Sequence, residues 1–310
     1  MAWTKGRVLS WGLLLLWVGM LPLGAAPASF SWSHWARSDY QLAQILERQR
    51  ACLLASGQAL KNFSQGRLPT DKAQAQLAKL QREGQSAFSQ LVRLEGQDQT
   101  LRAGAIDLGR RQLAQIKAAA KVAAAPIGRR GELLKLQTGE EATYAAQSRY
   151  LRLRAKGINL LLEGAQEAAK RSHERRGPAA PPAKLVEYYR FQRDLIQYQL
   201  QELSFSQAIL AALEEIAQER KGKPLTILPS VRQLGRDWER LSLGAELSAL
   251  HKAYAQEWSS LARFAEAVIL LQKDRSPDAV SRLQRWNSKL QRDSQAAAKL
   301  DLQVWGQLLP

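Results

Sequence analysis

A seam of mostly apolar residues, spaced alternately by three and four, runs through the first half of this 310-residue chain. Its members are Leu77, Leu80, Gly84, Ala87, Leu91, Leu94, Asp98, Leu101, Ala105 and Leu108. This spacing returns to one face of a helix every seven residues, which is typical of helices packed side by side at shallow angles. Because no Pro occurs between Pro69 and Pro126, the seam predicts one continuous helix over 70–125.

The rest of the chain carries similar periodic patterns, separated by Gly- and Pro-containing breaks. They predict helices from Asp39 to about Ser64, Glu132 to about Arg176, Ala183 to about Lys221, Ser230 to about Leu271, and Pro277 to about Val304. No stretch alternates apolar and polar residues as a strand does. Short breaks return a chain beside itself, so we expect an all-α fold: an elongated up-and-down antiparallel bundle of about six helices with coiled-coil-like seams.

The N-terminal residues form a separate segment. Val8–Leu23 is apolar and uncharged, Lys5 and Arg7 precede it, and Ala26–Ala28 follows it. A positive start, a short apolar middle and a small-residue exit are the layout of a secretory signal peptide. We therefore expect residues 1–28 to be cleaved and the chain to be exported, periplasmic or secreted. An uncleaved segment would instead tether the chain to a membrane.

A Pro-rich stretch divides the remainder of the chain. Residues 177–182 read Gly-Pro-Ala-Ala-Pro-Pro, and Pro does not continue a helix. We interpret this stretch as a linker between a first helical unit, 29–176, and a second helical unit, 183–310.

Catalytic sequence motifs are lacking: there is no Gly-x-Ser-x-Gly elbow, Walker loop, dinucleotide fingerprint, His-Glu-x-x-His or Cys pair. Four seam positions instead carry acids: Asp98, Glu202, Glu257 and Asp293. A metal pair in a helical bundle takes Glu-x-x-His from two helices, and none of the three His residues has a Glu three positions earlier. We therefore expect the acids to pair with Arg, to set helix register, or to mark places where the seam is locally wrong, and we predict no catalytic residue, cofactor or metal.

Positive charge is concentrated in one region. The formal net charge is +17, and residues 102–184 hold 17 Lys or Arg against 7 acids. The basic residues that approach the break at Pro126 or flank the linker are Arg110, Arg111, Lys117, Lys121, Arg129, Arg130, Lys170, Arg171, Arg175, Arg176 and Lys184. Such a field favours anionic partners. Anionic lipid headgroups, an acidic envelope polymer or an acidic protein suit an exported chain, whereas nucleic acid suits the charge but not the compartment. The alternative is a solvated basic surface without a dedicated ligand.

Two Trp residues near the C-terminus are candidate anchors for a partner. Trp258 and Trp305 lie one position off the seams of their helices, where aromatic side chains are partly exposed and contribute strongly to interfaces.

These patterns predict a non-catalytic exported helical-bundle protein that acts as an envelope scaffold, adaptor or accessory subunit. We expect its partner to be another envelope protein, and assembly of several copies of this chain into a homo-oligomer is an open alternative. The alternative function is a cationic binding protein for anionic lipid headgroups or an acidic envelope polymer. A helical-bundle metal protein or enzyme is a third hypothesis that no motif favours.

Overall fold

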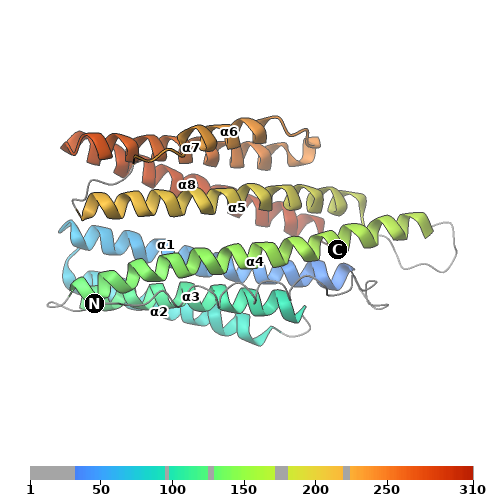
Figure 1. The fold of residues 1–310 in the computed structure, drawn as a ribbon. Coiled ribbons are helices and arrows are strands. Elements are labelled where there is room, and N and C mark those ends of the chain that lie inside the picture. The colour runs from blue at the N-terminus through green and yellow to red at the C-terminus, as the bar shows by residue number, and fades with distance from the viewer. Residues whose placement is uncertain (1–31, 95–97, 125–128, 172–180, 219–223, 310) are drawn as a thin grey trace, which may run out of the picture. The chain divides into compact units, whose positions relative to one another are not determined.

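A computed structural model describes residues 32–94, 98–124, 129–171, 181–218 and 224–309, and Figure 1 shows their arrangement. Within these ranges the chain forms eight α-helices and one short 3-10 helix, without a strand, so the predicted all-α class is confirmed. The predicted signal peptide, 1–28, and most of the predicted linker, 177–182, lie outside the described residues. None of the helices described is both long and apolar enough to cross a membrane.

Apart from α6 and the 3-10 helix, the helices are longer than the average helix of a globular protein. In chain order they are α1 (Trp32–Ser64), α2 (Thr70–Arg93), α3 (Gln99–Ala124), α4 (Arg129–Arg171), α5 (Ala183–Ala217), α6 (Leu228–Glu239), the 3-10 helix η1 (Ala245–Leu247), α7 (Ser248–Lys273) and α8 (Pro277–Leu308).

Residues Trp32–Pro310 form one compact unit. The described parts of the two predicted helical units, 29–176 and 183–310, both belong to it. They meet where α5 packs against α4 and where α8 packs against α1 (Figure 1).

The helix predicted over 70–125 is in fact two helices, which corrects the expectation from the seam. α2 ends at Arg93 and α3 begins at Gln99. Asp98 is the residue that starts α3, because its Oδ1 accepts hydrogen bonds from the backbone N–H groups of Thr100 and Leu101, at 2.8 and 3.1 Å. The first N–H groups of a helix have no partner within the helix, and an Asp at the N-cap satisfies them. Asp98 is therefore a cap and not a seam residue.

The helix predicted over residues 230–271 is also divided. α6 ends at Glu239, and α7 begins at Ser248 after η1. The two helices are joined by a reciprocal contact, in which Trp238 Nε1 donates to the His251 carbonyl at 2.9 Å and His251 Nε2 lies 2.7 Å from the Trp238 carbonyl oxygen. The predicted count of about six helices is thus too low.

Contacts between neighbouring helices show their relative direction. In α7 and α8, Tyr254 contacts Asp301 whereas Ser260 contacts Asp293, so the residue numbers run in opposite order. The same holds for α3 and α4, where Gly104 lies beside Leu153 and Gln115 lies beside Gly139. These neighbouring pairs are therefore antiparallel.

Candidate functional site

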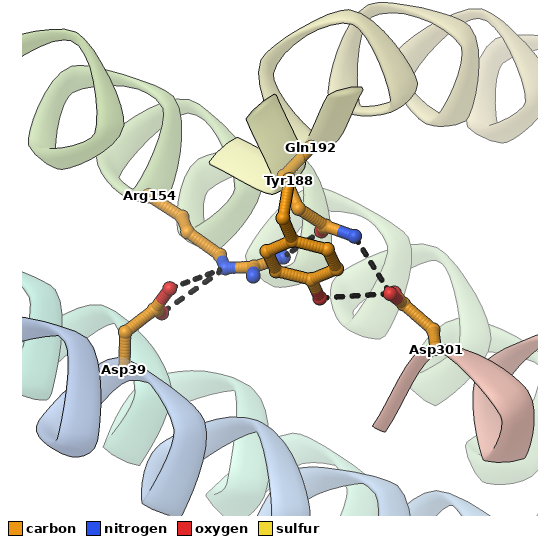
Figure 2. A network of polar contacts seen from close by, with 5 residues as sticks. All are labelled: Asp39, Arg154, Tyr188, Gln192 and Asp301. Atoms are coloured by element: carbon orange, nitrogen blue, oxygen red, sulfur yellow. Dashed lines mark hydrogen bonds and ion pairs between the residues drawn. The ribbon is translucent and has the colours of Figure 1, made fainter. Parts of the chain in front are cut away.

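A network of buried and partly buried polar side chains lies where α1, α4, α5 and α8 meet (Figure 2). Its members are Asp39 of α1, Arg154 of α4, Tyr188 and Gln192 of α5, and Asp301 of α8. We call this group the Asp39–Asp301 network. It joins helices from both ends of the sequence, because Asp39 and Arg154 are 115 residues apart and Tyr188 and Asp301 are 113 apart.

The network is a continuous chain of hydrogen bonds. Arg154 Nε lies 3.0 Å from each carboxylate oxygen of Asp39, and Arg154 Nη1 donates to Gln192 Oε1 at 2.9 Å. Gln192 Nε2 and the Tyr188 hydroxyl both donate to Asp301 Oδ1, at 2.7 and 2.8 Å. From α7, the Tyr254 hydroxyl donates to Asp301 Oδ2 at 3.2 Å, so a fifth helix is tied in.

The Asp39–Arg154 ion pair of this network is removed from water, whereas Asp301 is partly buried. Asp39 and Gln192 are 0% exposed and Arg154 is 7% exposed. Burial raises the pKa of the Asp39 carboxyl, while the neighbouring Arg154 guanidinium opposes that rise. Burial raises the pKa of Asp301 in the same way, against the opposing effect of Arg154. Removing one member would leave a buried charge without its partner, which is strongly destabilising.

Aromatic rings surround Arg154 and complete its environment. The guanidinium carbon lies 4.6 Å from the centroid of the Trp305 ring, within the range of a cation–π interaction. Arg154 Nη2 makes no hydrogen bond. Trp305 also packs against Tyr188 and Tyr189, with ring centroids 5.5 and 5.9 Å apart. The cation is thus held by hydrogen bonds on one side and by an aromatic face on another.

A second polar group lies further along α1, α5, α7 and α8. Its members are Glu47 and Arg50 of α1, Glu202 of α5, Glu257 of α7 and Ser294 of α8, and we call it the Glu202–Glu257 cluster. Arg50 Nη1 lies 3.2 Å from Glu47 Oε2, and Arg50 Nη2 donates to Ser294 Oγ. Burial raises the pKa of Glu257 and raises that of Glu202 well above the ordinary value. The charge of Glu257 raises the pKa of Glu202 further, whereas Arg50 lowers the pKa of both acids.

The four seam acids are not gathered in one place. The charge of Arg50 lowers the pKa of both Glu202 and Glu257, but the ion pair that Arg50 forms is with Glu47, so a direct pairing of these two acids with Arg stays a prediction. Asp293 instead pairs with Lys289 at 2.8 Å, and it also accepts a hydrogen bond from Ser260. Asp98 caps α3. No group of three or more His, Cys, Asp or Glu residues in the described ranges is placed to hold a metal ion.

The predicted basic residues fall into three groups. Arg110, Arg111, Lys117 and Lys121 are exposed on α3. Lys170 and Lys184 are exposed and form ion pairs with Glu167 and Glu246. Of the remainder, Arg129, Arg130 and Arg171 lie in α4 without described side chains, and Arg175 and Arg176 lie outside the described residues.

The predicted partial exposure of Trp258 and Trp305 is wrong. Each side chain is only 1% exposed. Trp258 packs against Trp238 and Tyr254, with ring centroids 6.2 Å apart in both pairs. Trp305 packs in the Asp39–Asp301 network. A position one step from the seam is still covered here because more than one neighbouring helix lies against each of these two helices.

A surface hollow of about 350 Å³ lies among α5, η1 and α8. It is lined by Lys184, Glu187, Glu246, Leu247, Val304, Gln307 and Leu308. The Asp39–Asp301 network does not line this hollow, so the buried charges and the hollow are separate features.

Sequence reasoning did not find the Asp39–Asp301 network. The sequence pattern marks Asp39 only as the start of a helix, and Asp301 lies one position after Leu300, which is on the predicted apolar seam of the last helix. The spacing of residues within one helix carries no sign of a partner more than 100 positions away. A signal would need paired changes at those positions in related chains.

No family model, curated protein or solved structure matches this chain. Its function therefore has to be inferred from the side chains and their placement.

Proposed function

We propose that this chain is a non-catalytic scaffold, adaptor or accessory subunit of the cell envelope, built as an exported, elongated antiparallel helical bundle. The observation that carries the proposal is the Asp39–Asp301 network. Its ionisable groups bind one another across five helices.

A reaction centre needs titratable groups that can reach a substrate. In the Asp39–Asp301 network both carboxylates are instead occupied by partners from neighbouring helices. Asp39 uses both oxygens on Arg154, and Asp301 accepts from Tyr188, Gln192 and Tyr254. A buried and bonded polar layer of this kind suits a role in fixing which helices pair and in which register.

Long antiparallel helices support the scaffold role, because they place distant surfaces on one stiff body. The apolar run Val8–Leu23 supports export, with an N-terminus near Ser29 after cleavage. An exported chain with a single Cys has no internal disulfide, so its stability comes from this packing.

The proposal is tested by isolating the full chain, with a C-terminal tag, from the cells that produce it after cross-linking in those cells. We expect recovery from the envelope fraction, an N-terminus at or near Ser29, and a cross-linked complex with another envelope protein at fixed stoichiometry. The control is the same chain lacking residues 2–28, which should remain in the cytosol and lose that complex.

Two results would overturn this function. One is a full chain that stays in the cytosol with residues 1–28 retained. The other is an exported chain that is recovered at the mass of a monomer, with no cross-linked partner.

A further inference from the structure

Two neighbouring rows of exposed cations lie on α3 and α4. The α3 row holds Arg110, Arg111, Lys117 and Lys121, and the α4 row holds Arg149, Arg152 and Lys156. We call these seven residues the α3–α4 basic face. Charge patterning along the chain singles out the α3 row, but the α4 row joins it only through the packing of the two helices.

Asp107 shows that the two rows lie side by side. Its Oδ1 is 3.6 Å from Arg111 Nε on its own helix, and its Oδ2 is 3.4 Å from Arg149 Nη1 on α4. Because α3 and α4 are antiparallel, Arg152 and Lys156 continue the basic face beyond Arg149, toward the N-terminal end of α3.

Most of these cations have no counter-charge among the side chains that the structure describes. Arg110, Lys117, Lys121, Arg152 and Lys156 make no ion pair with any other residue that the structure describes. Among the side chains that the structure describes, the acids near these rows are Asp107, which two Arg residues share, and the exposed Glu140, Glu141 and Glu163 of α4. Cations therefore outnumber acids on this face.

The dimensions of the face suit a flat anionic surface. From Lys121 to the level of Lys156, the rows extend about 30 Å along the helices at ~1.5 Å per residue. The axes of two packed helices are about 8–10 Å apart, so the two rows of charges are separated by a similar distance across the face. Ala114 is exposed between the α3 cations, and Ala103 is exposed two turns before Arg110, so small side chains allow close approach at both positions.

An exposed apolar side chain continues the α4 row. Leu160 is 41% exposed and lies one helical turn beyond Lys156. Long cationic side chains and an exposed Leu together suit the boundary between headgroups and water, where cations meet phosphates and an apolar side chain leaves water. A soluble polyanion would offer no apolar surface for Leu160.

We propose that the α3–α4 basic face docks this protein on the anionic lipid headgroups of a membrane. This inference goes beyond the scaffold function, which needs a protein partner and makes no demand on lipid. Binding is electrostatic, so it weakens as salt shortens the range of the attraction to about 8 Å at physiological ionic strength.

The test is co-sedimentation of the chain with vesicles of phosphatidylcholine alone or mixed with phosphatidylglycerol. The variant carries Arg110→Gln, Lys117→Gln and Lys121→Gln, which remove three unpaired, exposed charges and keep good helix formers. The matched control carries Lys252→Gln, Arg285→Gln and Lys299→Gln, which remove the same charge from exposed positions of α7 and α8. Circular dichroism and thermal melting establish that all three proteins are folded.

We expect binding to mixed vesicles at low salt, little binding to phosphatidylcholine, and loss of binding as salt rises. Each cation near an anionic bilayer increases binding roughly fivefold, so the α3 variant should bind about a hundredfold more weakly. The control should keep most of its binding. Equal losses in the two variants, or binding to soluble polyglutamate without binding to vesicles, would overturn the inference. Neither result bears on the protein complex that tests the scaffold function.

Discussion

Gly157 of α4 lies against the indole ring of Trp35, and this contact leaves no room for a side chain. A Cβ at position 157 would come within 2.9 Å of Trp35 Cε2. Trp35 is buried and packs on Tyr189, with ring centroids 5.7 Å apart, so the ring has little freedom to move. We expect Gly157→Ala to lower the free energy of unfolding by about 1–3 kcal/mol, measured by urea denaturation.

Gly164 on the same helix provides the matched control. A Cβ there would have no atom within 4 Å. Because Ala is a better helix former than Gly, Gly164→Ala should raise the free energy of unfolding by up to about 1 kcal/mol. A destabilisation of similar size at both positions would contradict the steric account of Gly157.

Among the elements, α3 depends on the cap that separates it from α2. Replacing Asp98 by Ala removes the acceptor of the Thr100 and Leu101 N–H groups. Loss of such an N-cap lowers the free energy of unfolding by about 1 kcal/mol. Urea denaturation of Asp98→Ala, read as a shift of the unfolding midpoint, measures this effect.

The substitution Asp71→Ala is the control that distinguishes the loss of a helix cap from the loss of a negative charge. Asp71 lies in the first turn of α2, where no side chain caps the helix, so the substitution removes the same charge from a helix N-terminus without removing a cap. Asp71→Ala should lower the free energy of unfolding by only about a few tenths of a kcal/mol. If both substitutions have equal effects, Asp98 acts through its charge alone.

For the whole molecule, the Glu202–Glu257 cluster makes stability depend on pH. Burial raises the folded-state pKa of both acids above the ordinary value of 4.5. Between 4.5 and the raised values, the folded chain binds more protons than the unfolded chain, so stability increases as the pH falls through this window and decreases as the pH rises. The charged groups that act on the two acids are Glu47 and Arg50 from α1 and Asp293 from α8.

A Glu257→Gln variant checks this dependence. Gln keeps the shape of the side chain and removes a buried carboxylate, so the free energy of unfolding at pH 8 should increase relative to the unchanged chain. The difference between the two proteins should shrink as the pH is lowered toward 5. Glu163→Gln, at an exposed position of α4, should show no such trend. A Glu257→Gln variant that is less stable than the unchanged chain at pH 8 would contradict this prediction. It would mean that the attraction between Arg50 and the Glu257 carboxylate exceeds the cost of burying that carboxylate.

The helices and their class were predictable because each depends on local chemistry. Apolar periodicity and Pro and Gly breaks act within a few residues, and so does the cap at the start of α8, where the Ser276 side chain accepts a hydrogen bond from the Ala279 N–H. The divisions at Asp98 and after Glu239 were missed because the apolar spacing continues, or resumes, across each break. A periodic pattern shows which face of a helix is apolar, but it does not require that the helix be continuous.

By itself the sequence determined that the chain is all-α, where its main breaks fall and where its positive charge is concentrated. The tertiary structure alone decided that Trp258 and Trp305 are buried, that Asp39 meets Arg154, and that the cations of α4 join those of α3. The physical reason is that burial and ion pairing depend on which helices are neighbours. Which helices are neighbours is fixed by packing between different helices, as between Asp107 and Arg149, 42 positions apart, or Asp39 and Arg154, 115 apart, and no spacing within one helix specifies it.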